Sequence, residues 1–343
     1  MKLPTELPII QAPMAGGPST PALTASVARA GGFGFLAAGY LSTDQLIDLI
    51  DSTRALSGAP FGVNIFCPSV PSDLEPVRRY AQVIEPESDR LGVALGGPRW
   101  DDDAFDDKIG IVASQRVDLV SFTFGCPDTA AVERLHTAGS RIAVTVTSLA
   151  EAQLAERAGA DLLLVQGTEA GGHQGSFLEL APNTRSLSSL LETIEASTPL
   201  PMVGSGGIMT GADATDVLQR GAIGVHLGTA YLCCPEAGTS STYRRVLLDQ
   251  TYSDTILTRA FSGRYARGLA NEFALTYGHA APFAYPEIHH LTRPLRAAAT
   301  AAGDPSVPNL WAGQGWRRMS ADSAEAITRG IAADIRALGN FLG

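Results

Sequence analysis

Two related segments carry the clearest information about the fold: RAGADLLLVQGT at residues 157–168, and RGAIGVHLGT at residues 220–229. In each, a glycine closes a helix-like stretch, a short apolar run follows, and the run ends in Gly-Thr. Apolar strands without polar alternation are typical of a parallel sheet that is covered on both faces. The recurrence therefore predicts a fold built from repeated strand–helix units.

Eight such strands alternate with helices over roughly the first two thirds of the chain. One intervening helix is marked by a capping box at 148–151 and by a closing Gly159. Eight alternations predict an α/β fold, the (β/α)8 TIM barrel, and an open doubly wound sheet is the alternative. The predicted strands are 9–13, 33–38, 61–66, 118–122, 142–146, 162–165, 201–204 and 224–227.

The pattern changes after about residue 232, where aromatic residues, arginines, histidines and prolines cluster as far as Pro308. We expect a second, smaller and mainly helical domain at residues 233–305. The barrel then comprises residues 1–232 and 306–343, because the helical stretch 320–342 is expected to return to it.

Composition excludes several classes of protein. The 343 residues are 45% hydrophobic and carry a net charge of −10, which disfavours binding to nucleic acids or to anionic membranes. Four cysteines without a CxxC pair give neither a disulfide framework nor a zinc ribbon, and no metal site is predicted. With no signal-peptide stretch and no apolar run near the length of a membrane span, we expect a cytoplasmic protein.

In a TIM barrel, chemistry takes place where the strands end. Gly206 and Gly207 follow the seventh predicted strand, and Gly228 and Thr229 follow the eighth. Glycine backbone at these two positions is typical of a phosphate site, because a Cβ would block the close approach of the anion. The alternative is that both segments are merely tight turns.

Other polar side chains follow other predicted strands. His173 stands in a glycine-rich loop, and its ordinary pKa suits a general base, although a solvent-exposed or structural histidine is the alternative. The amides of Asn64 and Gln166 could bind a flat heterocycle, or could bond to a neighbouring strand or loop. Met14 could pack on a cofactor ring or plug the barrel mouth.

The ordered set of motifs resembles one family, the class I nitronate monooxygenases, formerly called 2-nitropropane dioxygenases. The resemblance covers nearly the whole chain, with gaps around residues 70–115 and 176–198. The motifs that carry it are QAPMAGG (11–17), LAAGY (36–40), FGVN (61–64), SFTFG (121–125), the loop 166–175, GRYARGL (263–269) and WAGQG (311–315).

The resemblance implies FMN bound at the barrel mouth and His173 as the catalytic residue. Tyr285 and Gln314 are predicted beside the substrate, and a tyrosine packed in the second domain is the alternative for Tyr285. Two departures affect this set: Gln174 stands where the family often has arginine, and His226-Leu227 replaces other residues that are common there. The implied FMN contacts are Met14, Ala15, Asn64, Gln166, Gly171, Gly172, Gly206, Gly207, His226, Leu227, Gly228 and Thr229.

The activity implied by the resemblance is FMN-dependent oxidative denitrification, a detoxifying reaction. Alkyl nitronates such as propionate 3-nitronate, or nitroalkanes, would react with O2 to give a carbonyl compound and nitrite. A homo-oligomer is compatible with this reading. Two alternatives stay open: an FMN-dependent NAD(P)H reductase of the enoyl-acyl-carrier or quinone type, and a barrel that binds a phosphorylated ligand without redox chemistry.

Overall fold

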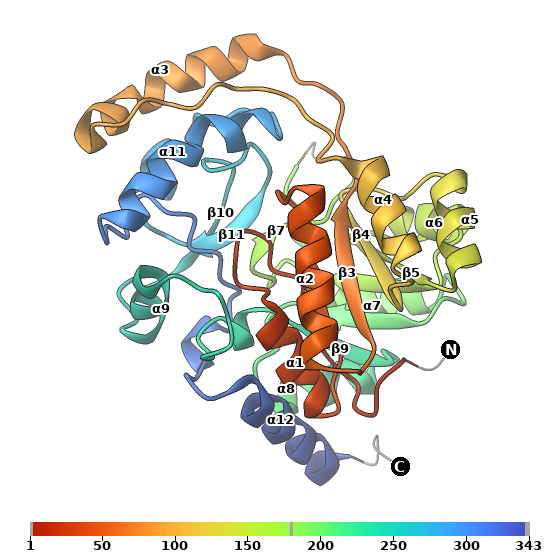
Figure 1. Ribbon diagram of the computed structural model, residues 1–343. Coiled ribbons are helices and arrows are strands. Elements are labelled where there is room, and N and C mark those ends of the chain that lie inside the picture. Colours follow the sequence, from red (N-terminus) through yellow and green to blue (C-terminus); the bar gives the residue numbers. More distant parts are fainter. Residues whose placement is uncertain (1–2, 179–180, 340–343) are drawn as a thin grey trace.

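A closed barrel of parallel strands forms the centre of the computed structural model, which describes residues 3–178 and 181–339 (Figure 1). The strand order is β1-β9-β8-β6-β5-β4-β3-β2. A parallel bridge between Ile10 and Phe33 joins the two ends of this order. The prediction of a TIM barrel is therefore confirmed. The strands are β1 (Ile9–Gln11), β2 (Gly34–Ala37), β3 (Phe61–Phe66), β4 (Leu119–Thr123), β5 (Arg141–Val146), β6 (Leu162–Gln166), β8 (Met202–Ser205) and β9 (Gly224–Leu227).

An outer ring of helices covers the barrel. Its last helix, α12, packs against α1 and α8. Two members of the ring, α5 and α7, have no counterpart among the predicted elements. The helices are α1 (Pro21–Arg29), α2 (Thr43–Leu56), α4 (Phe105–Ser114), α5 (Thr129–Ala138), α6 (Leu149–Ala158), α7 (Leu187–Glu195), α8 (Gly211–Gln219) and α12 (Ala324–Leu338). No helix in the described ranges is long and apolar enough to cross a membrane.

The barrel interior changes character along its axis. Its lower part is an apolar cluster that includes Phe33, Phe35, Leu119 and Leu164. Toward the carboxyl ends of the strands the inner side chains become polar. These polar side chains are Asn64, Thr145, Gln166, Ser205 and His226, and they line a cavity at the barrel mouth.

A smaller region covers this mouth. Its sheet, in the order β10-β11-β7, joins β10 (Thr255–Thr258) and β11 (Ala266–Leu269) to β7 (Gly172–His173), a two-residue strand from the loop after β6. The sequence analysis did not anticipate these three strands. The remaining elements are η1 (Thr229–Tyr231), α9 (Ser241–Leu248), α10 (Glu272–Tyr277), α11 (Glu287–Ala301) and η2 (Trp316–Arg318).

Helix α3 (Leu74–Leu91) also lies over the smaller region, beside α11 (Figure 1). Its buried Val77, Tyr80 and Ile84 share one apolar cluster with Ile288 and Leu291 of α11. The division into residues 1–232 plus 306–343 and residues 233–305 remains a prediction. This packing favours adding α3 to the smaller part.

Candidate active site

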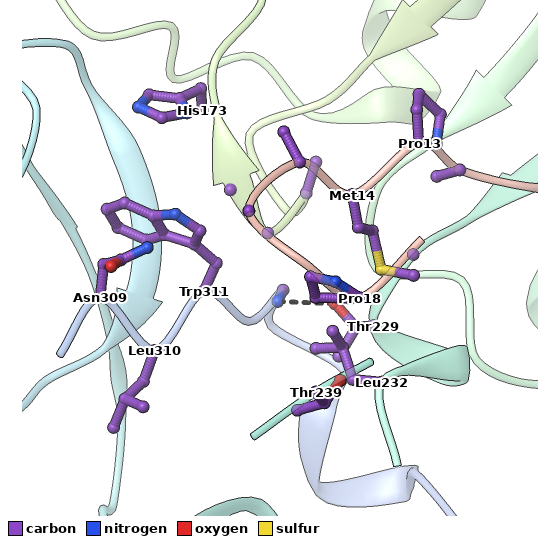
Figure 2. A pocket seen from close by; sticks show the side chains of 18 of the residues that line it. Pro13, Met14, Pro18, His173, Thr229, Leu232, Thr239, Asn309, Leu310 and Trp311 are labelled. Atoms are coloured by element: carbon purple, nitrogen blue, oxygen red, sulfur yellow. Dashed lines mark hydrogen bonds between the residues drawn. The ribbon is translucent and has the colours of Figure 1, made fainter. Parts of the chain in front are cut away.

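A cavity of about 370 Å³ lies between the barrel mouth and the smaller region. Figure 2 places Met14 and Thr229 on one side of it and Asn309 and Trp311 on the other, with His173 above them. All twelve predicted cofactor contacts line this cavity together with His173: Met14, Ala15, Asn64, Gln166, Gly171, Gly172, Gly206, Gly207, His226, Leu227, Gly228 and Thr229.

Glycine backbone forms one wall of the cavity. Gly206 has a φ of +132° and Gly207 a φ of +71°, backbone conformations that residues other than glycine rarely adopt. The hydroxyl of Thr229 accepts a hydrogen bond from the amide of Gly313 at 3.0 Å (Figure 2). The wall is thus mostly bare backbone, and its N–H groups suit an anion such as a phosphate.

His173 is held by backbone pairing and by its ring. Strand β7 pairs with β11, so that His173 lies opposite Ala266. The ring Nε2 lies 2.8 Å from Ser262 Oγ, and Trp311 packs against the ring at a centroid distance of 5.4 Å. Burial, together with the charges of Arg264 and Arg296, lowers the pKa of His173 to about 3. The imidazole is therefore neutral at pH 7.

The side-chain amides of Asn64 and Gln166 line the cavity and also form hydrogen bonds to a neighbouring strand and loop. Gln166 donates from Nε2 to His173 O at 3.0 Å and accepts from the amide of Gly175 at 2.8 Å, which fixes the histidine loop. Asn64 donates to Ser121 Oγ on the neighbouring strand at 2.9 Å. Both side chains are thus pre-oriented by the protein.

His226 lines the cavity and has one buried ring nitrogen without a partner in the described ranges. Only 7% of the residue is exposed, and its Nδ1 lies 3.3 Å from Ser205 Oγ. In the part of the chain that the structure describes, Nε2 has no hydrogen-bond partner. Burial lowers the pKa of His226 to about 3, so the ring is neutral. A buried polar atom of this kind is expected to find a partner in a bound group.

Comparison with known proteins agrees with this geometry. The sequence model of the nitronate monooxygenase family matches residues 1–329. A probable nitronate monooxygenase of Staphylococcus aureus (strain N315) is 36% identical over 346 residues, which cover 96% of this chain and 94% of the relative. The chain belongs to the nitronate monooxygenase family. The protein is accordingly an oxidoreductase, and its family oxidises nitronates or nitroalkanes with a flavin.

Solved structures also resemble this chain, and one of them is a nitroalkane oxidase. The nitroalkane oxidase from Streptomyces ansochromogenes superposes with a TM-score of 0.95 and 43% sequence identity, covering 98% of each chain. FabK from Thermotoga maritima superposes with a TM-score of 0.77 at 24% identity, covering 97% of this chain and 94% of that one. The second likeness concerns the fold alone.

Neither Tyr285 nor Gln314, the two residues predicted to lie beside the substrate, is among the residues that line the cavity. The ring of Tyr285 packs 5.9 Å from that of His173, and its hydroxyl donates to that of Tyr40 at 3.1 Å. Gln314 is exposed, and its side chain is not part of the cavity lining. Its backbone amide donates to Glu169 O at 3.0 Å.

The departure from the family pattern at Gln174 has a structural explanation. Gln174 is buried and exchanges hydrogen bonds of 2.7 and 2.9 Å with the backbone of Asn183, so it braces a loop. Positive charge nevertheless reaches His173, from Arg264 and Arg296 of the smaller region. The guanidinium of Arg264 lies 4.0 Å over the Phe124 ring.

The cavity residues that the sequence analysis did not assign to the site include Tyr40, His289, Arg296 and Trp311. Tyr40 and Trp311 fall inside motifs that it quoted. His289 and Arg296 are seven residues apart on α11, and this spacing places both on one face of a helix. The helical spacing alone gives no indication that this face meets the barrel mouth.

Proposed function

We propose that this protein uses FMN and O2 to oxidise alkyl nitronates, such as propionate 3-nitronate, to a carbonyl compound and nitrite. Nitroalkanes would be poorer substrates. The observation that carries the proposal is a neutral His173 in the wall of a cavity that also contains a glycine-backbone cradle and Arg296.

The cavity residues fit FMN. Backbone N–H groups at Gly206, Gly207 and Gly228 would hold the phosphate, and Met14 would lie beside the ring. The unsatisfied Nε2 of His226 would gain a polar partner on the cofactor. When bound, the flavin supplies the electron acceptor between substrate and O2.

His173 would act at its Nδ1. Ser262 holds Nε2, and Nδ1 makes no hydrogen bond to the described part of the chain, so Nδ1 is available to the substrate. It would take the α-proton of a nitroalkane or orient a nitronate. A histidine whose pKa is about 3 is a weak base, which favours a nitronate that has already lost its proton.

Oxygen uptake tests the proposal. The FMN-loaded protein is given propionate 3-nitronate without a nicotinamide cofactor, and both O2 consumption and nitrite are measured. We expect rapid uptake with matching nitrite. A yellow protein that consumes no O2 with nitronates, but whose flavin is reduced by NADH or NADPH, would overturn the proposal in favour of a nicotinamide-dependent reductase.

A further inference from the structure

Arg296 occupies an unusual position in the cavity. Among the described residues that line the cavity, it is the only arginine, lysine, aspartate or glutamate. The guanidinium of Arg264, by comparison, bonds to the carbonyl of Ser176 and lies over Phe124, outside the lining. The cavity therefore carries one fixed positive charge and no fixed negative charge.

Neutral acceptors hold the Arg296 side chain in place. Its Nε donates to Thr292 Oγ1 at 3.1 Å, Nη1 to Asn309 Oδ1 at 2.9 Å, and Nη2 to His289 O at 3.0 Å. Nη2 also lies 3.4 Å from His289 Nδ1, a long contact, so the N–H donor that is left over among the five of the guanidinium is on Nη1. The side chain is thus fixed while part of its hydrogen-bonding capacity remains unused.

No carboxylate compensates this charge within the described residues. Asp103, a carboxylate beside the cavity residue Tyr40, accepts from the amide of Tyr40 and forms an ion pair with Lys108 at 2.8 Å. Burial lowers the pKa of Arg296 to about 10, as expected for a cation withdrawn from water without an anion beside it. Such an arrangement is unfavourable unless an anion enters the cavity.

We propose that Arg296 binds an anionic oxygen pair of the substrate and thereby makes the enzyme prefer charged nitronates to neutral nitroalkanes. This inference rests on the proposed function. The free N–H of Nη1, together with the Nη2 N–H once it leaves its 3.4 Å contact with His289 Nδ1, matches a planar pair of oxygens. A nitronate group and a carboxylate both present such a pair of anionic oxygens, so either group of a substrate could bind to Arg296.

The surrounding aromatic residues support this role. The ring of His289 stacks on that of Tyr40 at a centroid distance of 4.0 Å and an interplanar angle of 6°, which makes a flat and rigid wall beside Arg296. Burial and the Arg296 charge hold the pKa of His289 well below its usual range, so this histidine adds no second cation.

Substitution at Arg296 provides the kinetic test. In the FMN-loaded enzyme, Arg296→Met is expected to raise the KM for ethyl nitronate about ten- to a hundredfold, because a hydrogen bond to a charged group is lost. The KM for neutral nitroethane should change by less than about threefold. Arg296→Lys keeps the positive charge but not the planar guanidinium, so its KM for ethyl nitronate should lie between the values of wild type and Arg296→Met. The matched control is Arg293→Met, since Arg293 is exposed on the same helix.

Propionate 3-nitronate distinguishes the two sources of the anion. If its KM rises in Arg296→Met while that of ethyl nitronate does not, Arg296 binds the carboxylate. If both rise, it binds the nitronate group. Unchanged KM values for both substrates in Arg296→Met and Arg296→Lys would overturn the inference.

Nitrate binding separates this inference from the proposed function. Nitrate is a planar anion that cannot be oxidised in this way, and its binding is followed by thermal shift or by the flavin spectrum. Wild-type protein and Arg293→Met should bind nitrate, and Arg296→Met should bind it at least about tenfold more weakly. A wild type that binds nitrate through Arg296 but oxidises no nitronate would refute only the proposed function. Equal nitrate binding by wild type and Arg296→Met would refute the anion site.

Discussion

The reactivity of His173 depends on its immediate neighbours. Ser262 holds Nε2, Trp311 packs against the ring, and the charges of Arg264 and Arg296 disfavour the imidazolium. Protonation of this ring is therefore unfavourable until negative charge arrives beside it. A nitronate brings that charge with it, whereas a nitroalkane acquires it only as the proton leaves.

Replacement of His173 by asparagine tests its role as base. We expect turnover of nitroethane to fall about 10²- to 10⁴-fold, since general-base catalysis contributes factors of this size. Turnover of ethyl nitronate should fall much less, because that substrate needs no deprotonation. Initial rates of O2 uptake measure both, and flavin content is the control. Equal losses for the two substrates would contradict a proton-transfer role.

Replacement of His226 tests whether its Nε2 faces the cofactor. We expect His226→Leu to weaken FMN binding about three- to tenfold, the value of one ordinary hydrogen bond. The apoprotein should be no less stable, because the variant removes a buried nitrogen that has no partner in the described ranges. His226→Gln retains polar atoms and serves as the matched control. Fluorescence titration of apoprotein with FMN gives the affinity, and a drop in apoprotein Tm with unchanged affinity would indicate a structural residue instead.

At the level of loops and strands, the segment after β6 fits closely against the chain at residues 312–313. A Cβ added to Gly171 would stand 2.5 Å from the amide nitrogen of Gly313 and 2.6 Å from the carbonyl carbon of Ala312. Backbone cannot move aside as a flexible side chain can. This contact therefore fixes how β7 and His173 approach the smaller region.

Gly171→Ala should disturb that approach. We expect it to destabilise the protein by about 1–3 kcal/mol, as overpacking usually does, and to weaken FMN binding. Gly97→Ala is the control, since a Cβ there meets nothing within 4 Å. Thermal unfolding with and without FMN measures both effects. A Gly171→Ala protein with wild-type Tm and FMN affinity would show that the two segments are not in firm contact.

Sequence patterns predicted the elements that form through local interactions. The barrel strands are apolar runs, and caps and glycines mark the ends of several of the helices. Hydrophobic periodicity and turn residues were therefore sufficient to predict the barrel. Strand β7 has two residues and exists only because Ala266 and Arg267 pair with it from a distant segment. Arg296 likewise reaches the cavity through tertiary packing of α11. Neither feature leaves a local pattern. The glycine-rich loop made His173 one candidate base, and the motif resemblance then identified it as the catalytic residue.

For the molecule as a whole, three buried neutral histidines couple stability to pH. Burial lowers the pKa of His173 and of His226 to about 3, and that of His289 well below its usual range. Above about pH 6.5 these side chains are neutral in both the folded and the unfolded chain, and they add no pH dependence. Below that pH the unfolded chain takes up protons that the folded chain does not.

The free energy of unfolding should therefore fall as the pH drops from about 6.5 toward 3. Each histidine contributes about 1.4 kcal/mol per pH unit, and the three together about 4 kcal/mol per unit at most. Burial also raises the pKa of Asp103, so the folded chain holds the proton of this carboxyl more firmly than the unfolded chain does. Asp103 therefore raises the free energy of unfolding as the pH falls, which opposes the effect of the histidines. Urea unfolding of the apoprotein at pH 5, 6, 7 and 8 measures the dependence. His226→Leu should lower the slope below pH 6 by about one third, whereas a stability that stays constant from pH 7 to pH 5 would show that these rings are hydrated.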